Sequence, residues 1–288
     1  MTIPNWFRIV LLIFTFASFL PQIRQLWLRR DSSGISLYYV LFNLMVATQI
    51  LTIDLAVLMG VEESDVFVTN PISAGDWLNL AQFGVVWALW ALVLVASIAF
   101  YPREETRGVP MTVSAIYTIY LLITLVPIIL VTASAAPRQD RRWFDAIFLF
   151  FHTYCLNPWF DAIFLFFHTY CLNPFITILG IAALYAQART IRACPGGSGV
   201  GALSIVGLAA QAVVFFVVGF TWPGRLFWPF PILGRAFFIW IQMVGFVLVD
   251  YVIFAVVQAD LLYIAMRHSG LEIGSGGVRR TGEREPLL

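Results

Sequence analysis

Long apolar runs, separated by short polar segments, dominate the chain. Seven of these runs come close to or exceed the roughly 20 apolar residues that a helix needs to cross about 30 Å of hydrocarbon. They cover residues 6–28, 35–59, 77–100, 111–134, 167–188, 200–222 and 235–265. Because the apolar residues are continuous rather than alternating, the pattern predicts an all-α membrane protein with seven transmembrane helices.

The ends of the first and fifth runs carry related polar motifs. Pro21-Gln22 is followed by arginines, a turn and the next apolar run, and Ala186-Gln187 is followed by the same order of features about 165 residues later. The chain is therefore expected to contain two repeats. The aligned pairs are Pro21 with Ala186, Gln22 with Gln187, Arg24 with Arg189, Ser36 with Ser204, and Asn43 with Gln211.

One segment interrupts this order, because residues 143–158 recur without change as residues 159–174. A single helix over residues 143–188 would be roughly 69 Å long, more than twice the membrane thickness. We therefore interpret the first copy as a short interfacial or re-entrant segment, produced by an in-frame duplication or a gene-model error. The predicted organisation is a first repeat at 1–110, a linker helix and loop at 111–142, the duplicated segment at 143–158, a second repeat at 159–268 and a disordered cytosolic tail at 269–288.

Composition supports a membrane protein and excludes several other classes. Apolar residues make up 60% of the chain and charged residues only 11%, and a net charge of +1 gives no argument for nucleic-acid binding. All seventeen basic residues are arginine, which removes Schiff-base chemistry. No catalytic or cofactor motif occurs, so we expect neither an enzyme nor a bound cofactor. The His and Cys residues at 152, 155, 168 and 171 belong to the duplicated apolar segment, and we expect no metal site there.

The distribution of arginines predicts the orientation. With the N-terminus in the lumen and the C-terminus in the cytosol, eleven of the seventeen arginines lie in cytosolic segments, as the positive-inside rule favours. The tail then exposes Glu283, Leu287 and Leu288, which have the form of an acidic dileucine sorting signal. A cytosolic sorting adaptor and a vacuolar or lysosomal membrane are the expected partner and location.

The Pro-Gln stretch and its later counterpart resemble the PQ-loop repeat family, which includes the lysosomal cystine transporter, vacuolar basic-amino-acid transporters, the SWEET sugar transporters and, more distantly, the KDEL receptor. The segment at residues 75–82 is similar to fungal members of this family. The resemblance implies two parallel three-helix bundles joined by a linker helix, a 3+1+3 arrangement. The second motif is degenerate, because Ala186 stands where the family has proline.

Several intramembrane polar residues are candidates for function. Pro21 removes a helical hydrogen bond from the carbonyl of Ala17, so the Pro21-Gln22 motif is a candidate hinge, and Ala186-Gln187 is its weaker counterpart. Asp250 costs at least about 2.5 kcal/mol at mid-membrane unless it is protonated, which suits it to carry a proton. Its surroundings resemble the seventh span of the cystine transporter, where an aspartate couples protons.

Other polar residues are weaker candidates. Asp54 is a second acid for proton coupling, although it could also reach the membrane interface. The amides Asn43 with Gln211, and Gln82 with Gln242, are candidates for binding one solute from both repeats. Hydrogen bonds between helices are the alternative role for these amides.

Together these features predict proton-coupled export of a small polar solute, an amino acid in our interpretation, from an acidic vacuole or lysosome. The alternatives are a non-transporting receptor or sorting and assembly factor, and a sugar uniporter. The solute, protons and the lipid bilayer are the expected partners.

Overall fold

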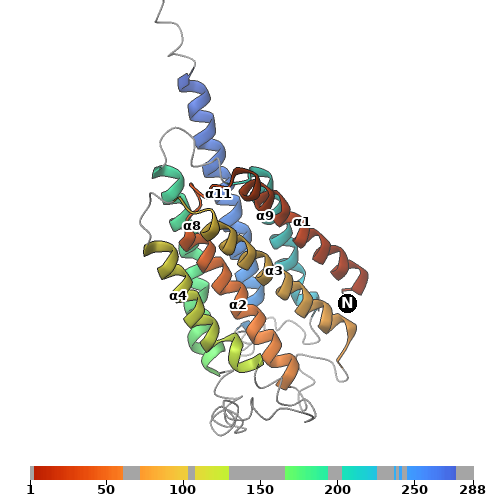
Figure 1. The fold of residues 1–288 in the computed structure, drawn as a ribbon. Coiled ribbons are helices and arrows are strands. Elements are labelled where there is room, and N and C mark those ends of the chain that lie inside the picture. The colour runs from red at the N-terminus through yellow and green to blue at the C-terminus, as the bar shows by residue number, and fades with distance from the viewer. Residues whose placement is uncertain are drawn as a thin grey trace, which may run out of the picture.

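The structure is a computed structural model that describes residues 3–60, 72–102, 108–129, 166–193, 203–225, 237, 240–241 and 245–276. Within these residues the chain is entirely helical and contains no strand. Seven of the described helices are long and apolar enough to cross a membrane, which confirms the predicted fold class (Figure 1). They are α1 (Asn5–Arg29), α2 (Leu37–Gly60), α3 (Ala74–Ala99), α4 (Gly108–Ile123, with helical residues to 129), α8 (Asn173–Ala193) with the preceding π-helix η1 (Phe167–Leu172), α9 (Ile205–Thr221) with the 3-10 helix η3 (Trp222–Arg225), and α11 (Phe246–Gly276).

The helix ends lie close to the predicted ones in most spans, because hydropathy and local capping residues set them. Ser73 and Asp76 form a capping box that begins α3, and Arg30 ends α1 with a left-handed backbone, φ 49°. The main difference is at α11, which continues to Gly276. The prediction of disorder from residue 269 is therefore wrong for residues 269–276. The first duplicate, residues 143–158, lies outside the described residues.

The helices pack as two triplets with matching contacts. In the first, α3 lies against both α1 and α2, and in the second, α11 lies against both α8 and α9. The triplets meet where α1 contacts α9 and where α2 contacts α8. Exchanging the triplets converts one of these cross-contacts into the other, which is the pattern that two related repeats produce. The α4 helix packs on α2, and its role as a linker in a 3+1+3 arrangement stays a prediction.

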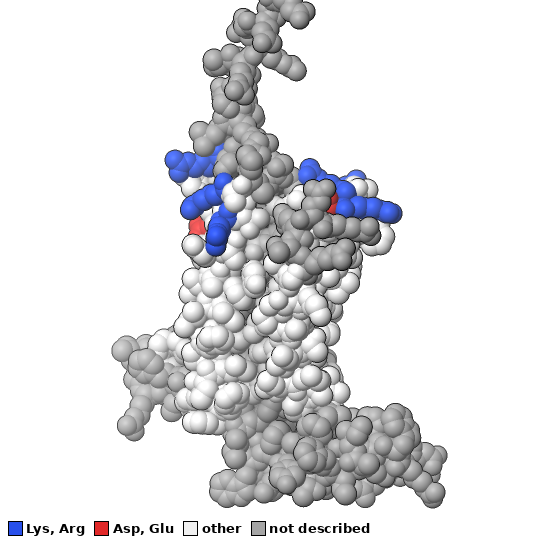
Figure 2. Space-filling model, turned by 60° about the vertical axis from the view of Figure 1, so that its left-hand side comes forward, with Lys and Arg blue, Asp and Glu red and all other residues white. Residues whose placement is uncertain are grey.

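The C-terminal parts of α1 and α8 lie at the same end of the bundle, as does the C-terminal part of α11, which projects beyond it (Figure 1). Figure 2 shows basic side chains gathered at this end and a broad belt without charged side chains next to it. We call this end the arginine-rich end. Its exposed arginines include Arg24, Arg29, Arg30, Arg189, Arg192 and Arg267.

A column of aromatic rings fills the interface between the triplets. Neighbouring ring centroids lie 5.2–6.4 Å apart, mostly in edge-on or tilted pairs, the geometry that aromatic quadrupoles favour. The column begins near the start of α2, at the arginine-rich end, and reaches η3 at the opposite end. The aromatic column consists of Tyr39, Trp90, Phe19, Phe254, Phe215, Tyr251, Phe83 and Trp222.

Candidate functional site

The glutamines of the two motifs reach across the interface between the triplets. Each one caps the start of the second helix of the opposite triplet. The Oε1 atom of Gln22 in α1 accepts a hydrogen bond from the backbone N–H of Ser204, which begins α9, at 2.8 Å. The Oε1 atom of Gln187 in α8 accepts one from the backbone N–H of Ser36, just before α2, also at 2.8 Å. The two bonds are equivalent under exchange of the repeats, and they require α1 and α8 to run in the same direction.

These bonds are favourable because the first N–H groups of a helix have no partner within it. The amide of Gln187 also donates from Nε2 to the carbonyl of Gly34, at 2.7 Å, and the positive φ of Gly34, 89°, suits a glycine in this turn. At the other helix start, the Ser204 hydroxyl accepts from the N–H of Gly207 at 3.1 Å. The glutamine amides therefore join the helix starts of one repeat to the Pro-Gln region of the other.

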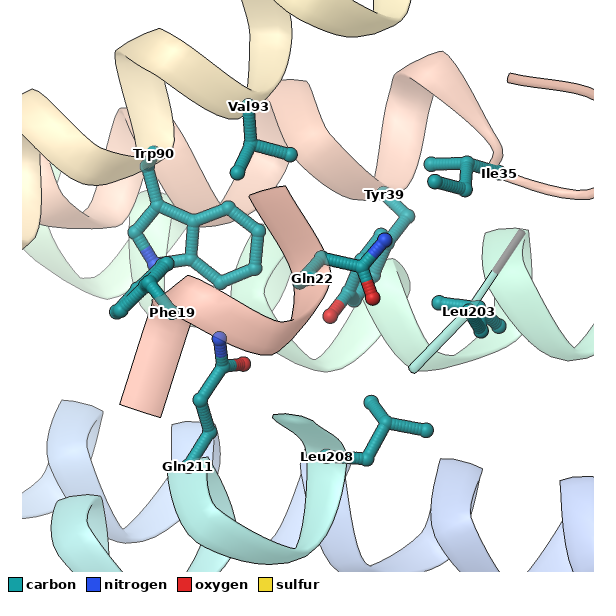
Figure 3. Close-up of a pocket in the computed structure, with 9 residues that line it drawn as sticks. All are labelled: Phe19, Gln22, Ile35, Tyr39, Trp90, Val93, Leu203, Leu208 and Gln211. Carbon is teal, nitrogen blue, oxygen red and sulfur yellow. The ribbon is translucent and has the colours of Figure 1, made fainter. Parts of the chain in front are cut away.

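A small cavity lies between the triplets beside these caps. Gln22 and Gln211 reach into it from α1 and α9, with Phe19 and Trp90 on one side and aliphatic side chains on the other (Figure 3). About 10 Å³ of it can be reached by the centre of a water molecule, which is room for one water. In this conformation the cavity is too small for an amino acid. The full lining is Phe19, Gln22, Ile35, Tyr39, Trp90, Val93, Leu203, Leu208 and Gln211.

The structure separates the amides that the sequence had paired. Gln211 lines the cavity, but Asn43 does not, because its Nδ2 donates to the carbonyl of Tyr39 at 2.7 Å within α2. Gln82 donates to the hydroxyl of Thr15 at 2.6 Å, which joins α3 to α1. Gln242 lies outside the described residues. Gln22 and Gln211 are therefore the amide pair that the structure brings to one cavity.

The acid Asp250 lies deep inside the bundle, where it is only 1% exposed. Its Oδ1 accepts a hydrogen bond from the Thr177 hydroxyl of α8 at 2.7 Å, and its Oδ2 has no partner among the described residues. Asp250 precedes Arg267 by about 25 Å of helix, so it lies toward the end opposite the arginine-rich end. Asp54 is half-buried, and one of its oxygens also lacks a described partner.

Comparison with known families assigns the first repeat. Residues 3–48 match the family model described as PQ loop repeat. This segment is similar to a PQ-loop repeat. It contains Gln22 and Ser36, two of the four residues of the reciprocal caps, and it is consistent with a transporter-like membrane protein. No curated protein and no solved structure matches the chain.

The third helices of the two triplets also correspond. Phe83 of α3 and Tyr251 of α11 face each other across the interface with centroids 6.1 Å apart. In this register Asp250 occupies the place in the second triplet that Gln82 has in the first, one residue before the facing ring. Each of these two polar residues bonds to a threonine on the first helix of its own triplet. At this matched position the first triplet therefore has an amide, Gln82, and the second has an acid, Asp250.

Sequence reasoning missed a polar network that joins α2 to α4 and η1. The Tyr120 hydroxyl donates to Gln49 Oε1 at 3.0 Å, and Gln49 Nε2 donates to the carbonyl of His168 at 3.1 Å. His168 Nδ1 lies 3.2 Å from the same Gln49 oxygen. A tyrosine, an amide and a histidine in apolar spans were the available signal, but their spacing did not reveal that they meet.

Three further expectations concern the sorting motif, a metal site and the hinge. The sorting motif at Glu283, Leu287 and Leu288 lies outside the described residues. Among the residues that the structure describes, no cluster of three or more His, Cys, Asp or Glu could hold a metal ion. The α1 helix continues through Pro21, and α8 through Ala186, so their proposed hinge role stays a prediction.

Proposed function

We propose that the protein moves a small polar solute, an amino acid, across the membrane along the interface between its two triplets. The observation that carries this proposal is the cavity between the repeats, which receives one amide from each repeat, Gln22 and Gln211, beside the reciprocal caps. Amides on facing elements can hydrogen-bond a polar solute from two sides. The similarity of residues 3–48 to a PQ-loop repeat supports the same class of function.

The proposed cycle alternates access between the two ends. The caps formed by Gln22 and Gln187 hold the arginine-rich end closed in this conformation, and the aromatic column fills the rest of the interface. Opening the arginine-rich end separates α1 from α9 and α2 from α8, and breaks both caps. Bending at Pro21, where the helix lacks one backbone hydrogen bond, is the proposed hinge.

Proton coupling is assigned to Asp250 in this proposal. One of its oxygens is held by Thr177, and the other has no described partner, so protonation would satisfy the buried carboxyl group without a counter-ion. Acid on the lumenal side loads the proton, and the neutral cytosol removes it. Export from an acidic vacuole or lysosome follows from that direction, with the arginine-rich end in the cytosol as the positive-inside rule favours.

The test is uptake into vesicles that contain the purified full-length protein and carry an imposed pH gradient. Transport of a mixture of labelled amino acids should be faster in the direction in which protons flow down their gradient. Asp250→Asn should abolish this stimulation of transport by the gradient. Asp260→Asn is the matched control, because Asp260 is an exposed acid on the same helix, and it should behave like the wild type. Gradient-stimulated transport that persists in Asp250→Asn would contradict proton coupling by this residue.

One observation favours a second candidate, a sugar uniporter. No side chain that is charged at neutral pH lines the described cavity, while aromatic rings and amides do, as suits an uncharged polyol. A uniporter predicts glucose flux that is equal with and without a pH gradient and unchanged in Asp250→Asn. Neither amino-acid nor sugar flux, together with a stably bound protein partner, would instead indicate a receptor or assembly factor.

A further inference from the structure

Two arginines are buried at the end of the bundle opposite the arginine-rich end. Arg8, in the second turn of α1, is 6% exposed, and Arg225, at the end of η3, is 5% exposed. They are in direct contact, because the Arg8 guanidinium donates to the backbone carbonyl of Arg225 at 3.2 Å. Two like charges in an apolar protein are costly, so the neighbours of each guanidinium matter.

Arg8 is fully engaged in holding the structure together. Its guanidinium donates to the carbonyls of Ile3, Gly75 and Arg225 and to the side-chain oxygen of Asn79, at 2.9–3.3 Å. These bonds connect the N-terminal segment, α3 and η3 around one side chain. Arg8 therefore acts as a clamp, and one of its bonds fixes the backbone of the second arginine.

Arg225 is held in place but remains available for binding. Its backbone carbonyl accepts a hydrogen bond from the Arg8 guanidinium, and the preceding carbonyl, that of Gly224, accepts one from the N–H of Ile3 at 3.0 Å. Its side chain donates to the Thr221 hydroxyl at 3.2 Å, whereas its Nε has no partner among the described residues. No carboxylate in the described part of the chain forms an ion pair with it. A buried guanidinium with a spare donor and no counter-ion is suited to receive an anion.

The η3 helix, which carries Arg225, lies at one end of the aromatic column. Trp222, three residues before Arg225, packs on Phe83 with ring centroids 5.2 Å apart, and Phe83 packs on Tyr251 of α11 at 6.1 Å. The buried guanidinium is therefore held at the end of the interface between the triplets.

We propose that Arg225 binds the carboxylate of the solute at the end of the bundle opposite the arginine-rich end. This inference rests on the proposed function, because it names a residue that recognises the solute of the same path. It differs from that proposal because it assigns solute binding to Arg225, at the opposite end of the bundle from the cavity that Gln22 and Gln211 line.

The test measures binding to the purified full-length protein with a mixture of labelled L-amino acids as the probe. Unlabelled amino acids should compete at least 100-fold better than the amines that remain after removal of their carboxylate. Arg225→Gln should weaken binding at least tenfold. Arg225→Lys should bind better than Arg225→Gln but less well than the wild type, because lysine keeps the positive charge but lacks the two parallel N–H donors of the guanidinium. Arg267→Gln, an exposed arginine on α11, is the control and should stay within twofold of the wild type.

Three results would overturn the inference. The first is equal competition by the amines, a result that needs no variant and so does not depend on folding. The second is binding by Arg225→Gln within twofold of the wild type. The third is the lack of saturable binding of the probe to the wild type. A carboxylate of the chain itself is the alternative anion, and Glu62, Glu63 and Asp65, which lie outside the described residues, are tested for this role. If E62Q/E63Q/D65N lowers the melting temperature as much as Arg225→Gln and the combined variant shows no added loss, the chain itself supplies the anion and the inference falls.

Flux measurements separate this inference from the proposed function. If the wild type and Arg225→Gln carry amino acids equally, the proposed function stands and the carboxylate site is refuted. If the wild type binds amino acids through Arg225 but shows no flux of any solute, the carboxylate site stands and the transport proposal is refuted.

Discussion

Replacing Gln187 by leucine tests whether the reciprocal caps hold the two repeats together. Gln187 is 0% exposed, and both ends of its amide are used, by the Ser36 N–H at 2.8 Å and by the Gly34 carbonyl at 2.7 Å. Leucine keeps the approximate volume but leaves one buried donor and one buried acceptor without a partner. At about 1–3 kcal/mol for each unsatisfied group, the free energy of unfolding should fall by about 2–6 kcal/mol.

The measurement is unfolding by SDS in mixed micelles, followed by tryptophan fluorescence. Arg189→Gln is the control, because Arg189 is exposed and only two residues away on α8. Gln22→Leu should give a loss of similar size, since its bond to Ser204 is the equivalent cap. If Gln187→Leu unfolds within about 0.5 kcal/mol of the wild type, the cap does not stabilise the closed interface and this reasoning is refuted.

The same substitution should also shift the conformational equilibrium. If both bonds exist only while the arginine-rich end is closed, a loss of about 3 kcal/mol favours the open state by about 100-fold. A cysteine introduced by Leu208→Cys, in a background without the native cysteines, lines the cavity and reports on opening. Its labelling by a membrane-impermeant thiol reagent should accelerate in Gln187→Leu, and equal labelling rates in both backgrounds would count against the caps as a gate.

Three further substitutions probe packing and polar contacts. Gly219→Ala should destabilise by about 1–3 kcal/mol in thermal unfolding, since the added Cβ would lie 2.9 Å from a side-chain carbon of α11, whereas Gly84→Ala meets open space and should be neutral; equal effects would contradict the packing argument. Gln211→Leu should reduce solute flux more than Asn43→Leu, because only Gln211 lines the cavity, and the reverse order in vesicle uptake would remove the cavity from the path. Tyr120→Phe should cost about 1 kcal/mol in SDS unfolding, because the hydroxyl donates to a buried amide and carbonyl, and an unchanged midpoint would show that these bonds contribute nothing.

Local sequence was sufficient to locate the spans, because the cost of placing a residue in hydrocarbon adds up along a continuous stretch. The predicted start at residue 167 coincides with the start of η1, and the predicted end of α1 at residue 28 is one residue from the observed Arg29. The tail after residue 269 was misjudged because glycine and polar content suggested disorder, while the helix continues from the apolar part of α11 to Gly276.

The correspondence of Gln22 with Gln187 and of Ser36 with Ser204 was also readable from the sequence, since repeated motifs keep their order. The sequence alone did not indicate that each glutamine caps a helix of the other repeat. That contact depends on how α1 packs on α9 and α8 on α2, and residues about 150 or more positions apart meet only when both triplets are assembled.

The sequence by itself determined the class of protein and its helices and indicated the correspondence of two polar motifs, because these follow from local hydropathy and from order along the chain. The tertiary structure alone decided which polar residues face one another. It placed Gln211 in the cavity and Asn43 against its own helix, and it buried Arg225 at the end of η3. The physical reason is that depth and facing depend on the rotation and crossing of packed helices, which hydropathy does not encode.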